Sequence, residues 1–248
     1  MGHDRIIALR NNKTVFRDGD KVLKVFDGSF KESEVLSEAL NQARVEETGL
    51  PVPSVREVTL TDGRGTIVTE YIKGKTLGAL MAEQPQRRGE YISRLVDIQL
   101  EIHAKRCPEL VRQRDKMIRH IIESELSATE RYDLYSRLDA MPKHSKLCHG
   151  DLGPSNIMIT ESGEHYILDW SHASQGNGAA DAARTYLLLW CDGDNESAEL
   201  YLDFYCERSG AEQCYVRRWL PIVAAARLPQ ANEAEREYLR PFISAEYD

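Results

Sequence analysis

The chain has 248 residues and a formal net charge of -8, and 42% of its residues are hydrophobic and 29% are charged. This composition is ordinary for a globular protein with a substantial core, built as one large domain or two modest ones. The acidic balance argues against a nucleic-acid binder, which needs a basic face, and favours small cationic partners only weakly.

The five cysteines are scattered, and no two of them form a CxxC pair. Neither a disulfide scaffold nor a zinc ribbon is indicated, and a reducing compartment fits this pattern. Residues 1–10 carry no apolar signal region, and no window approaches the roughly 20 apolar residues that span a bilayer. We therefore expect a soluble cytoplasmic protein, a monomer or weak dimer, with no membrane or nucleic-acid partner.

Short β-prone segments separated by polar turns open the chain at Ile6–Ala8, Thr14–Phe16 and Lys21–Phe26. They are typical of an antiparallel meander. In the third segment, two-residue alternation places Lys24 among apolar neighbours. The local sequence fits an exposed edge lysine and a buried, paired lysine about equally well.

A helix of about four turns is expected next, because Ser29 and Glu32 match the ends of a capping box and apolar residues at helical spacing follow. Glu34 and Glu38 lie one turn apart on this helix. Either glutamate can lean toward the sheet and meet Lys24, and both can equally be solvated helix charges.

After a hairpin at residues 55–71 the pattern changes from β-rich to helical near residue 74. We therefore expect a β-rich lobe at residues 1–73 and a larger helical lobe at residues 74–248. Within the second lobe, a short strand at Lys146–Cys148 and a hairpin at residues 156–169 interrupt the helices. Later helices are expected at 181–191, 198–208, 213–228 and 232–240.

The stretch HGDLGPSNIMITESGEHYILDW at residues 149–170 gathers the polar groups with the clearest chemistry. Asp151 and Asn156 are five residues apart across a loop, and the hairpin returns Asp169 to the same edge. Asn156 and Asp169 offer the hard oxygen ligands that Mg²⁺ takes together with phosphates. Asp151 is left to orient and deprotonate a hydroxyl, as phosphoryl transfer to an alcohol requires. A single loop aspartate is more often a turn former, but the joint pattern favours a site.

HGDLGPSN followed by ILDW resembles the catalytic and metal-binding loops of the aminoglycoside phosphotransferase and choline kinase-like family, relatives of the protein kinases. The protein-kinase signatures are HRDxxxxN and DFG. In this chain Gly150 replaces the arginine of the first signature, and Trp170 replaces the phenylalanine of the second. The other matching segments, in the expected order, are KVLKVF, ALNQARVEETGLPVP, TEYIKGKTL, IHA and GAADAAR.

The resemblance implies an α+β, bilobal protein kinase-like fold, with a small antiparallel sheet and one helix in the N-lobe and a mainly helical C-lobe. It implies an enzyme that moves the γ-phosphate of ATP or GTP to a hydroxyl of a small molecule, with Mg²⁺ as cofactor. An idle nucleotide-binding protein on the same fold is one alternative. A protein kinase is the other, which the short run from Asp169 to Asp181 disfavours because it leaves little room for an activation loop.

The resemblance also assigns roles to individual residues. Asp151 resembles the catalytic base, and Asn156 and Asp169 resemble the Mg²⁺ ligands. Lys24 resembles the third-strand lysine that contacts the α- and β-phosphates, with Glu38 as its preferred ion-pair partner and Glu34 as the fallback.

Two further residues resemble structural supports of the catalytic loop: His149, which braces it by hydrogen bonding, and Asp181, which holds its backbone from the following helix. The purine is expected against Thr69 and the backbone of Glu70 and Ile72. Because backbone contacts leave no side-chain signature, ATP and GTP are not distinguished.

The segment LRNNK at residues 9–13 departs from the protein-kinase pattern, since it contains no glycine where a glycine-rich loop covers the phosphates. Asn11, which tolerates left-handed backbone, and the charge of Lys13 are expected to contact the nucleotide. On the acceptor side, an acidic run could bind a cation, although a solvated helix face is at least as good a reading. Its members are Asp192, Asp194, Glu196, Asp203 and Glu207.

Overall fold

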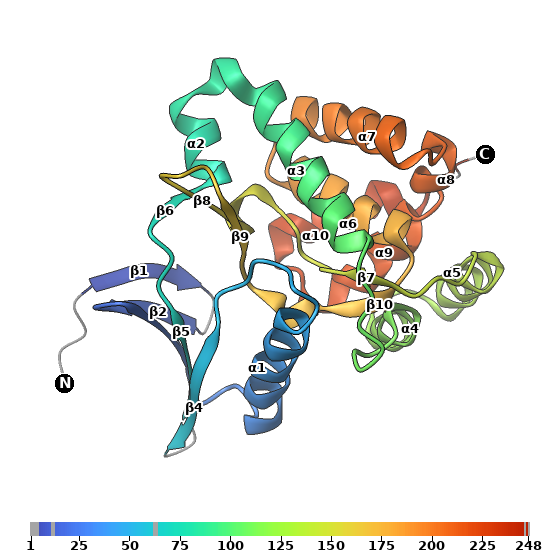
Figure 1. Cartoon of the computed structure of the whole chain (residues 1–248). Helices are drawn as coiled ribbons and strands as arrows, with labels where there is room; N and C mark the ends of the chain where they lie inside the picture. The colour runs from blue at the N-terminus through green and yellow to red at the C-terminus, as the bar shows by residue number, and fades with distance from the viewer. Residues whose placement is uncertain (1–4, 11–12, 62–63, 246, 248) are drawn as a thin grey trace. The chain divides into compact units, whose positions relative to one another are not determined.

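The computed structural model describes residues 5–10, 13–61, 64–245 and 247 (Figure 1). The chain divides into two compact units. The first consists of residues 1–77 and 155–172, and the second consists of residues 78–154 and 173–248. The boundary expected at residue 73/74 lies near the first of these divisions, but residues 155–172, expected in the larger lobe, belong by their contacts to the first unit.

A five-stranded antiparallel sheet forms the frame of the first unit, with the strand order β1-β2-β3-β5-β4. Its strands are β1 (Arg5–Arg10), β2 (Lys13–Asp18), β3 (Lys21–Phe26), β4 (Val55–Thr61) and β5 (Arg64–Glu70). The meander and the hairpin expected from the alternation are therefore both present. In this register Lys24 of β3 pairs with Ile67 of β5, so strand β3 is central and Lys24 does not lie on an edge.

Helix α1 (Glu32–Glu46) packs against β4 and β5, as Figure 1 shows. Its buried Val35 and Ala39 meet Phe26 and Ile67 in one apolar cluster. The start of the helix differs from the expectation, because Ser29 bonds to Asp27 instead of capping. The Glu34 carboxylate accepts a hydrogen bond from the backbone N–H of Lys31, the residue before the helix, and Glu34 thus has a capping role.

A second, three-stranded sheet joins the two segments of the first unit. Strand β8 (Ile157–Thr160) pairs with β6 (Gly74–Thr76) on one side and with β9 (His165–Ile167) on the other. The close approach at Gly74 explains this residue, since a Cβ there would lie 2.2 Å from the carbonyl oxygen of Ile159. The backbone N–H of Ile167 also donates to the carbonyl of Pro51. These backbone bonds are why residues 155–172 belong with the sheet.

The second unit is mainly helical. Helices α3 and α7 lie side by side in Figure 1, and α6 packs against both α7 and α9. A two-stranded sheet of β7 and β10 lies beside α4. The elements of this unit, with α2 running across the boundary, are α2 (Leu77–Glu83), α3 (Arg88–His103), α4 (Gln113–Glu123), α5 (Ala128–Ala140), β7 (Lys146–Cys148), β10 (Ser174–Gly176), α6 (Gly178–Cys191), α7 (Asn195–Ser209), α8 (Gln213–Arg217), α9 (Leu220–Arg227) and α10 (Glu233–Ile243). Four 3₁₀ turns complete the chain at Pro85–Arg87, Pro154–Asn156, Trp170–His172 and Leu228–Gln230.

The single helix expected at 213–228 is wrong, because the chain breaks between α8 and α9. Pro221 lies in the first turn of α9 and supplies no N–H for a helical hydrogen bond to the preceding turn, which interrupts the bonding although Arg218 and Trp219 keep helical backbone angles. Within the described residues, no helix has both the length and the apolar character needed to cross a membrane.

Candidate active site

Lys24 lies between two carboxylates of the first unit. Its Nζ donates to Glu38 on α1 and to Asp169 Oδ1 at 3.0 Å. The ion pair between Lys24 and Glu38 that the sequence analysis prefers is therefore present, and Glu34 is not the partner. Asp169 is 145 positions away in the sequence, so the fold alone brings it to Lys24.

The charge state of Lys24 follows from this environment. Burial by itself lowers the pKa of this lysine, but the charges of Asp169 and Glu38 and their hydrogen bonds outweigh burial and raise the pKa above 10.5. Lys24 is therefore a fixed cation at neutral pH. A cation held in one pose by two carboxylates is prepared to bind a polyphosphate.

Lys13, at the start of β2, donates through Nζ to Glu38 Oε2 at 2.9 Å, while Lys24 donates to the other oxygen of this carboxylate. Its ammonium group also lies over the rings of Phe26 and Phe30, at 4.8 Å and 5.0 Å from their centroids. Two lysines thus converge on one glutamate. Asn11, the other residue expected from the glycine-free segment, lies outside the described residues.

Asn156 and Asp169 occupy the same end of the β8–β9 hairpin. The backbone N–H of Leu168, which precedes Asp169, donates to the carbonyl of Asn156 at 2.8 Å. Asp169 has a φ of 61°, the one positive φ at a described residue other than glycine. Such a conformation costs about 1–3 kcal/mol and is concentrated at functional sites, which favours a functional role for Asp169.

Trp170 explains how that strained residue is held. Its side chain is fully buried, and its Nε1 donates to the carbonyl of Ile167 at 3.1 Å. The turn Trp170–His172 also packs against α1, the helix that carries Glu38. The bond from Trp170, which stands in place of the usual phenylalanine, to Ile167 therefore closes the turn that contains Asp169.

The three residues expected near the purine lie at the end of β5. Thr69 pairs with Val22 and lies on the same face of the sheet as Lys24, because partners across an antiparallel pair share a face. Glu70 ends the strand, and its carboxylate accepts from the backbone N–H of Ser54. Ile72 follows in the segment before β6.

The loop that begins at His149 in the second unit is shaped by hydrogen bonds to its own backbone. The N–H of Asp151 donates to Nδ1 of the buried His149 at 3.2 Å. This bond is the kind of contact that the predicted bracing role of His149 requires. Gly150 has a φ of 82°, which a residue with a side chain adopts only at a cost.

Asp181 on α6 holds this loop from behind. Its Oδ2 accepts from the N–H of His149 at 3.1 Å, and its Oδ1 accepts from the N–H of Gly150 at 2.7 Å. Oδ2 also accepts from Gln99 and lies 3.1 Å from Nε2 of His103. Burial alone raises the pKa of Asp181, but these bonds and the neighbouring histidine charges lower it overall, so Asp181 is ionised.

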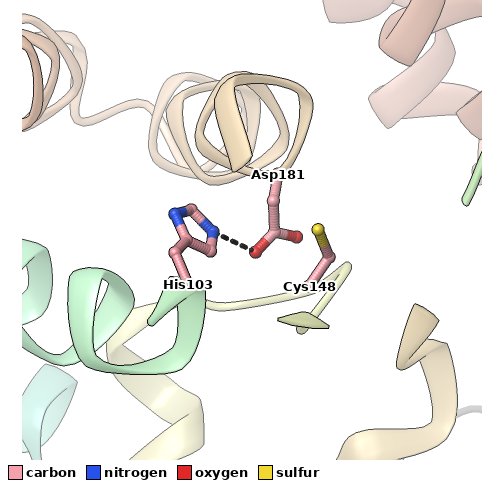
Figure 2. Close-up of side chains that lie close together, drawn as sticks. All are labelled: His103, Cys148 and Asp181. Atoms are coloured by element: carbon pink, nitrogen blue, oxygen red, sulfur yellow. Dashed lines mark hydrogen bonds and ion pairs between the residues drawn. The ribbon is translucent and has the colours of Figure 1, made fainter. Parts of the chain in front are cut away.

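Figure 2 shows Asp181 together with His103 and Cys148, a set of side chains with metal-ligating atoms that lie within 4.8 Å of one another. Burial and the charge of Asp181 raise the pKa of the Cys148 thiol well above its ordinary value, so the thiol stays protonated. Metal binding needs a thiolate, and the oxygens of Asp181 already accept several hydrogen bonds. The group is a structural brace beneath the catalytic loop.

Arg184, one turn after Asp181 on α6, is the partner of Asp151 that the sequence analysis did not assign. Its Nη2 donates to Asp151 Oδ1 at 2.8 Å, and its side chain is 7% exposed. The Asp151 side chain is 25% exposed and thus accessible to a substrate. The spacing of Arg184 three residues after Asp181 is the signal that places both side chains toward the same loop.

Most side chains of the acidic run expected on the acceptor side form capping hydrogen bonds, ion pairs or other hydrogen bonds with nearby residues. Asp194 caps α7 by accepting from the N–H of Ser197, Glu196 pairs with Arg88, and Asp203 accepts from Gln213. Asp192 differs, because partial desolvation and the charge of Glu235 raise its pKa although the residue is exposed. Glu207 is exposed near the end of α7.

A test of the Lys24 arrangement compares the two glutamates of α1. Lys24→Met is expected to lower kcat about 10²- to 10³-fold, since it removes a fixed cation from the phosphates. Glu38→Gln is expected to lower kcat about 10- to 100-fold, because it removes the group that orients the lysine. Initial rates of nucleotide-dependent phosphoryl transfer measure both.

Glu34→Gln is the matched control for Glu38→Gln, because Glu34 lies one turn away on the same helix and accepts its hydrogen bond from the helix start. It is expected to leave kcat unchanged. Equal losses for the two glutamate variants would show that α1 stability, and not the orientation of Lys24, is what the assay reports.

Comparison with known proteins agrees with this geometry. The family model described as the phosphotransferase enzyme family matches residues 5–220. A search of the curated proteins finds no significant match. Solved structures do match, over nearly the whole chain.

A choline/ethanolamine kinase family protein from Mesorhizobium loti is 19% identical, with a TM-score of 0.64 over 98% of this chain and 86% of that one. An aminoglycoside phosphotransferase, APH(4)-Ia, as a thermostable mutant in complex with ADP and hygromycin B, is 14% identical, with a TM-score of 0.69 over 96% and 90%. Choline kinase LicA from Streptococcus pneumoniae is 17% identical, with a TM-score of 0.63 over 98% and 92%.

These likenesses establish the protein kinase-like fold of the small-molecule kinases, with an antiparallel N-terminal sheet and a mainly helical C-terminal part. The family model covers most of the sequence, and the chain belongs to the phosphotransferase enzyme family. It is a small-molecule kinase, which uses a nucleotide to phosphorylate a hydroxyl group.

Proposed function

We propose that this kinase transfers the γ-phosphate of ATP or GTP, with Mg²⁺, to a hydroxyl of an aminoglycoside-like compound or another small metabolite. The observation that carries the proposal is the position of Lys24 between Glu38 and Asp169. A cation fixed between two carboxylates in a strand of the sheet matches the phosphate-contacting lysine of this enzyme class.

Asn156 and Asp169 are suited to Mg²⁺. Both are hard oxygen donors and they lie at one end of the β8–β9 hairpin, where Asp169 has the positive φ that is concentrated at functional sites. They would hold the ion, which when bound neutralises charge on the phosphates. Lys24 supplies a further positive charge, which Asp169 and Glu38 keep in place.

We propose Asp151 as the base. Its carboxylate accepts the proton of the acceptor hydroxyl, whose oxygen forms a bond to the γ-phosphorus while the bond from this phosphorus to the bridging oxygen breaks and the nucleoside diphosphate leaves. His149 and Asp181 fix the loop backbone on either side of Gly150, and Arg184 binds one oxygen of Asp151. The second unit thus supplies a preorganised proton acceptor.

The nucleotide is proposed to contact Lys13 through its phosphates, and Thr69, Glu70 and Ile72 through its purine. In support, Lys13 shares Glu38 with Lys24, and Thr69 lies on the face of the sheet that carries Lys24. Asn11, two positions before Lys13, is proposed as a phosphate contact on sequence grounds alone.

For the acceptor, Asp192 is the residue with the strongest support. Although Asp192 is exposed, partial desolvation and the charges of Glu235, Asp151 and Asp194 raise its pKa, with Arg184 as the opposing charge. A positively charged group on the acceptor would relieve this repulsion. We therefore propose an acceptor that carries an amine or ammonium group near its reactive hydroxyl.

We further propose that the protein works in the cytoplasm as a monomer or weak dimer, without a nucleic-acid or membrane partner. The net charge of -8 and the five free thiols support this. Neither the idle nucleotide-binding protein nor the protein kinase has a specific observation in its favour among the described residues.

The proposal is tested by following ADP and GDP release across a panel of hydroxylated amines that includes hygromycin B and choline, with and without Mg²⁺. We expect Mg²⁺-dependent release that rises with one cationic acceptor class and not with its neutral analogues. Release that is equal with and without Mg²⁺ would contradict the assignment of Asn156 and Asp169. Preference for neutral acceptors would contradict the role of Asp192.

A further inference from the structure

Arg184 lies between two carboxylates of the second unit. One nitrogen, Nη2, donates to Asp151 at 2.8 Å, and the other, Nη1, is 3.6 Å from Glu235 Oε1 on α10. Nη1 is buried and has no hydrogen-bond partner among the described residues. The guanidinium of Arg184 is thus hydrogen-bonded to Asp151, whereas its interaction with Glu235 is an ion pair without a hydrogen bond.

Glu235 is itself held in place by two independent contacts. Both of its oxygens bind Arg227 on α9, at 2.8 Å and 3.1 Å. Its backbone N–H donates to Asn232, the residue that caps α10. Charges therefore alternate along Asp151, Arg184, Glu235 and Arg227, and the chain of contacts ends at the start of the last helix.

The burial of this chain makes each charge depend on its neighbours. The side chains of Arg184 and Glu235 are 7% and 15% exposed, so water screens them poorly. When one member of a buried pair is removed, its partner is left without compensation and turns to the next opposite charge. Without Glu235, Arg184 would be attracted more strongly to Asp151, its other carboxylate partner.

We propose that Arg184 is a positioning residue for the base Asp151, and that Glu235 on α10, acting through Arg184, limits how strongly that base is held. This rests on the proposed function of Asp151. Arg184 keeps the carboxylate of Asp151 in one orientation. Glu235 attracts the same guanidinium and so weakens its interaction with Asp151, which leaves Asp151 able to accept a proton. The start of α10 thereby adjusts proton transfer without contacting substrate.

The experiment is a double-mutant cycle on the full chain. The variants are Arg184→Met, Arg184→Lys, Glu235→Gln and the double variant Arg184→Met with Glu235→Gln. The readouts are kcat and the nucleotide KM for Mg²⁺-dependent ATP hydrolysis, with water as the acceptor, and the melting temperature of each variant. Arg217→Met is the matched control, since Arg217 forms an ion pair with Glu199 in the same unit but has no part in the proposed mechanism.

Arg184→Met is expected to lower kcat about 10- to 100-fold with the nucleotide KM unchanged, and Arg184→Lys is expected to restore part of the loss. Glu235→Gln is expected to lower kcat about 2- to 10-fold in the wild-type background and to have no further effect when Arg184 is already Met. Arg217→Met is expected to lower only the melting temperature.

Variants of Arg184 that lower the melting temperature but leave kcat at the wild-type value would overturn the proposal, because the contacts would then be structural. Independent, multiplicative effects of Arg184 and Glu235 on kcat would overturn the part assigned to Glu235. Failure of the proposed function is distinguishable, since Asp151→Asn would then hydrolyse ATP at the wild-type rate whatever the Arg184 variants do.

Discussion

Replacing Asp151 by Asn is expected to lower kcat for phosphoryl transfer about 10²- to 10⁴-fold while nucleotide binding persists. The amide cannot accept the proton of the acceptor hydroxyl. It keeps an oxygen for the 2.8 Å bond from Arg184, so the loop is not expected to rearrange. Rates of ADP or GDP release with the best acceptor measure the first effect.

Nucleotide binding is measured separately as the rise in melting temperature with Mg²⁺ and ATP or GTP, which stabilises the folded state by mass action. Asp203→Asn is the control, because Asp203 is exposed on α7 and accepts a hydrogen bond from Gln213. Loss of both transfer and nucleotide-induced stabilisation in Asp151→Asn would mean that Asp151 is a metal ligand and that the base has been misassigned.

Replacing Asp181 by Asn is expected to have the largest effect on stability, about 3–5 kcal/mol, because it disrupts a buried, charged acceptor. The groups that hydrogen-bond to this carboxylate are donors: the backbone N–H groups of His149 and Gly150, and the side chains of Gln99 and His103. The side-chain N–H groups of the new asparagine would face these donors, and neither side would have an acceptor. Thermal unfolding should show a decrease on the order of 10 °C in Tm.

Asp97→Asn is the matched control, since Asp97 pairs with Arg208 at an exposed position and should cost less than about 1 kcal/mol. A comparably small loss in Asp181→Asn would show that the loop is supported without this carboxylate. Because the loop carries Asp151, we also expect kcat of Asp181→Asn to fall at temperatures well below its Tm.

Acid titration tests the same group. The pKa of Asp181 is lowered below its ordinary value of 3.8 in the folded protein, because the hydrogen bonds and histidine charges exceed the effect of burial. Its contribution is therefore present above pH 3.8 and is lost as the pH falls through the lower, folded pKa. Asp181→Asn should remove this part of the acid dependence of unfolding, and an unchanged profile would contradict it.

Local sequence patterns determined much of the fold. Two-residue alternation and turn residues were enough for the meander of β1 to β3 and the hairpin of β4 and β5, because each strand pairs with a near neighbour in sequence. The capping box was misplaced by a few residues, since Ser29 bonds to Asp27 and Glu34 takes the capping role. Helix ends depend on such side-chain choices, which periodicity does not report.

For the candidate site, the spacing within residues 149–170 was enough to select Asp151, Asn156 and Asp169, because a tight loop and a short hairpin constrain where side chains can lie. The choice of Glu38 over Glu34 came from the resemblance and is present in the structure. The roles of these residues remain proposals that the variants above test.

The sequence by itself determined the order of the elements, the polar residues of the loop and hairpin, and the family, since all of these depend on patterns among residues close together in the chain. Only the tertiary structure decided that residues 155–172 join the β-rich unit, that Asp169 reaches Lys24, and that Asp151 is bound by Arg184. The reason is physical: contacts between residues far apart in the chain are set by packing and charge compensation across many elements, and no local periodicity encodes them.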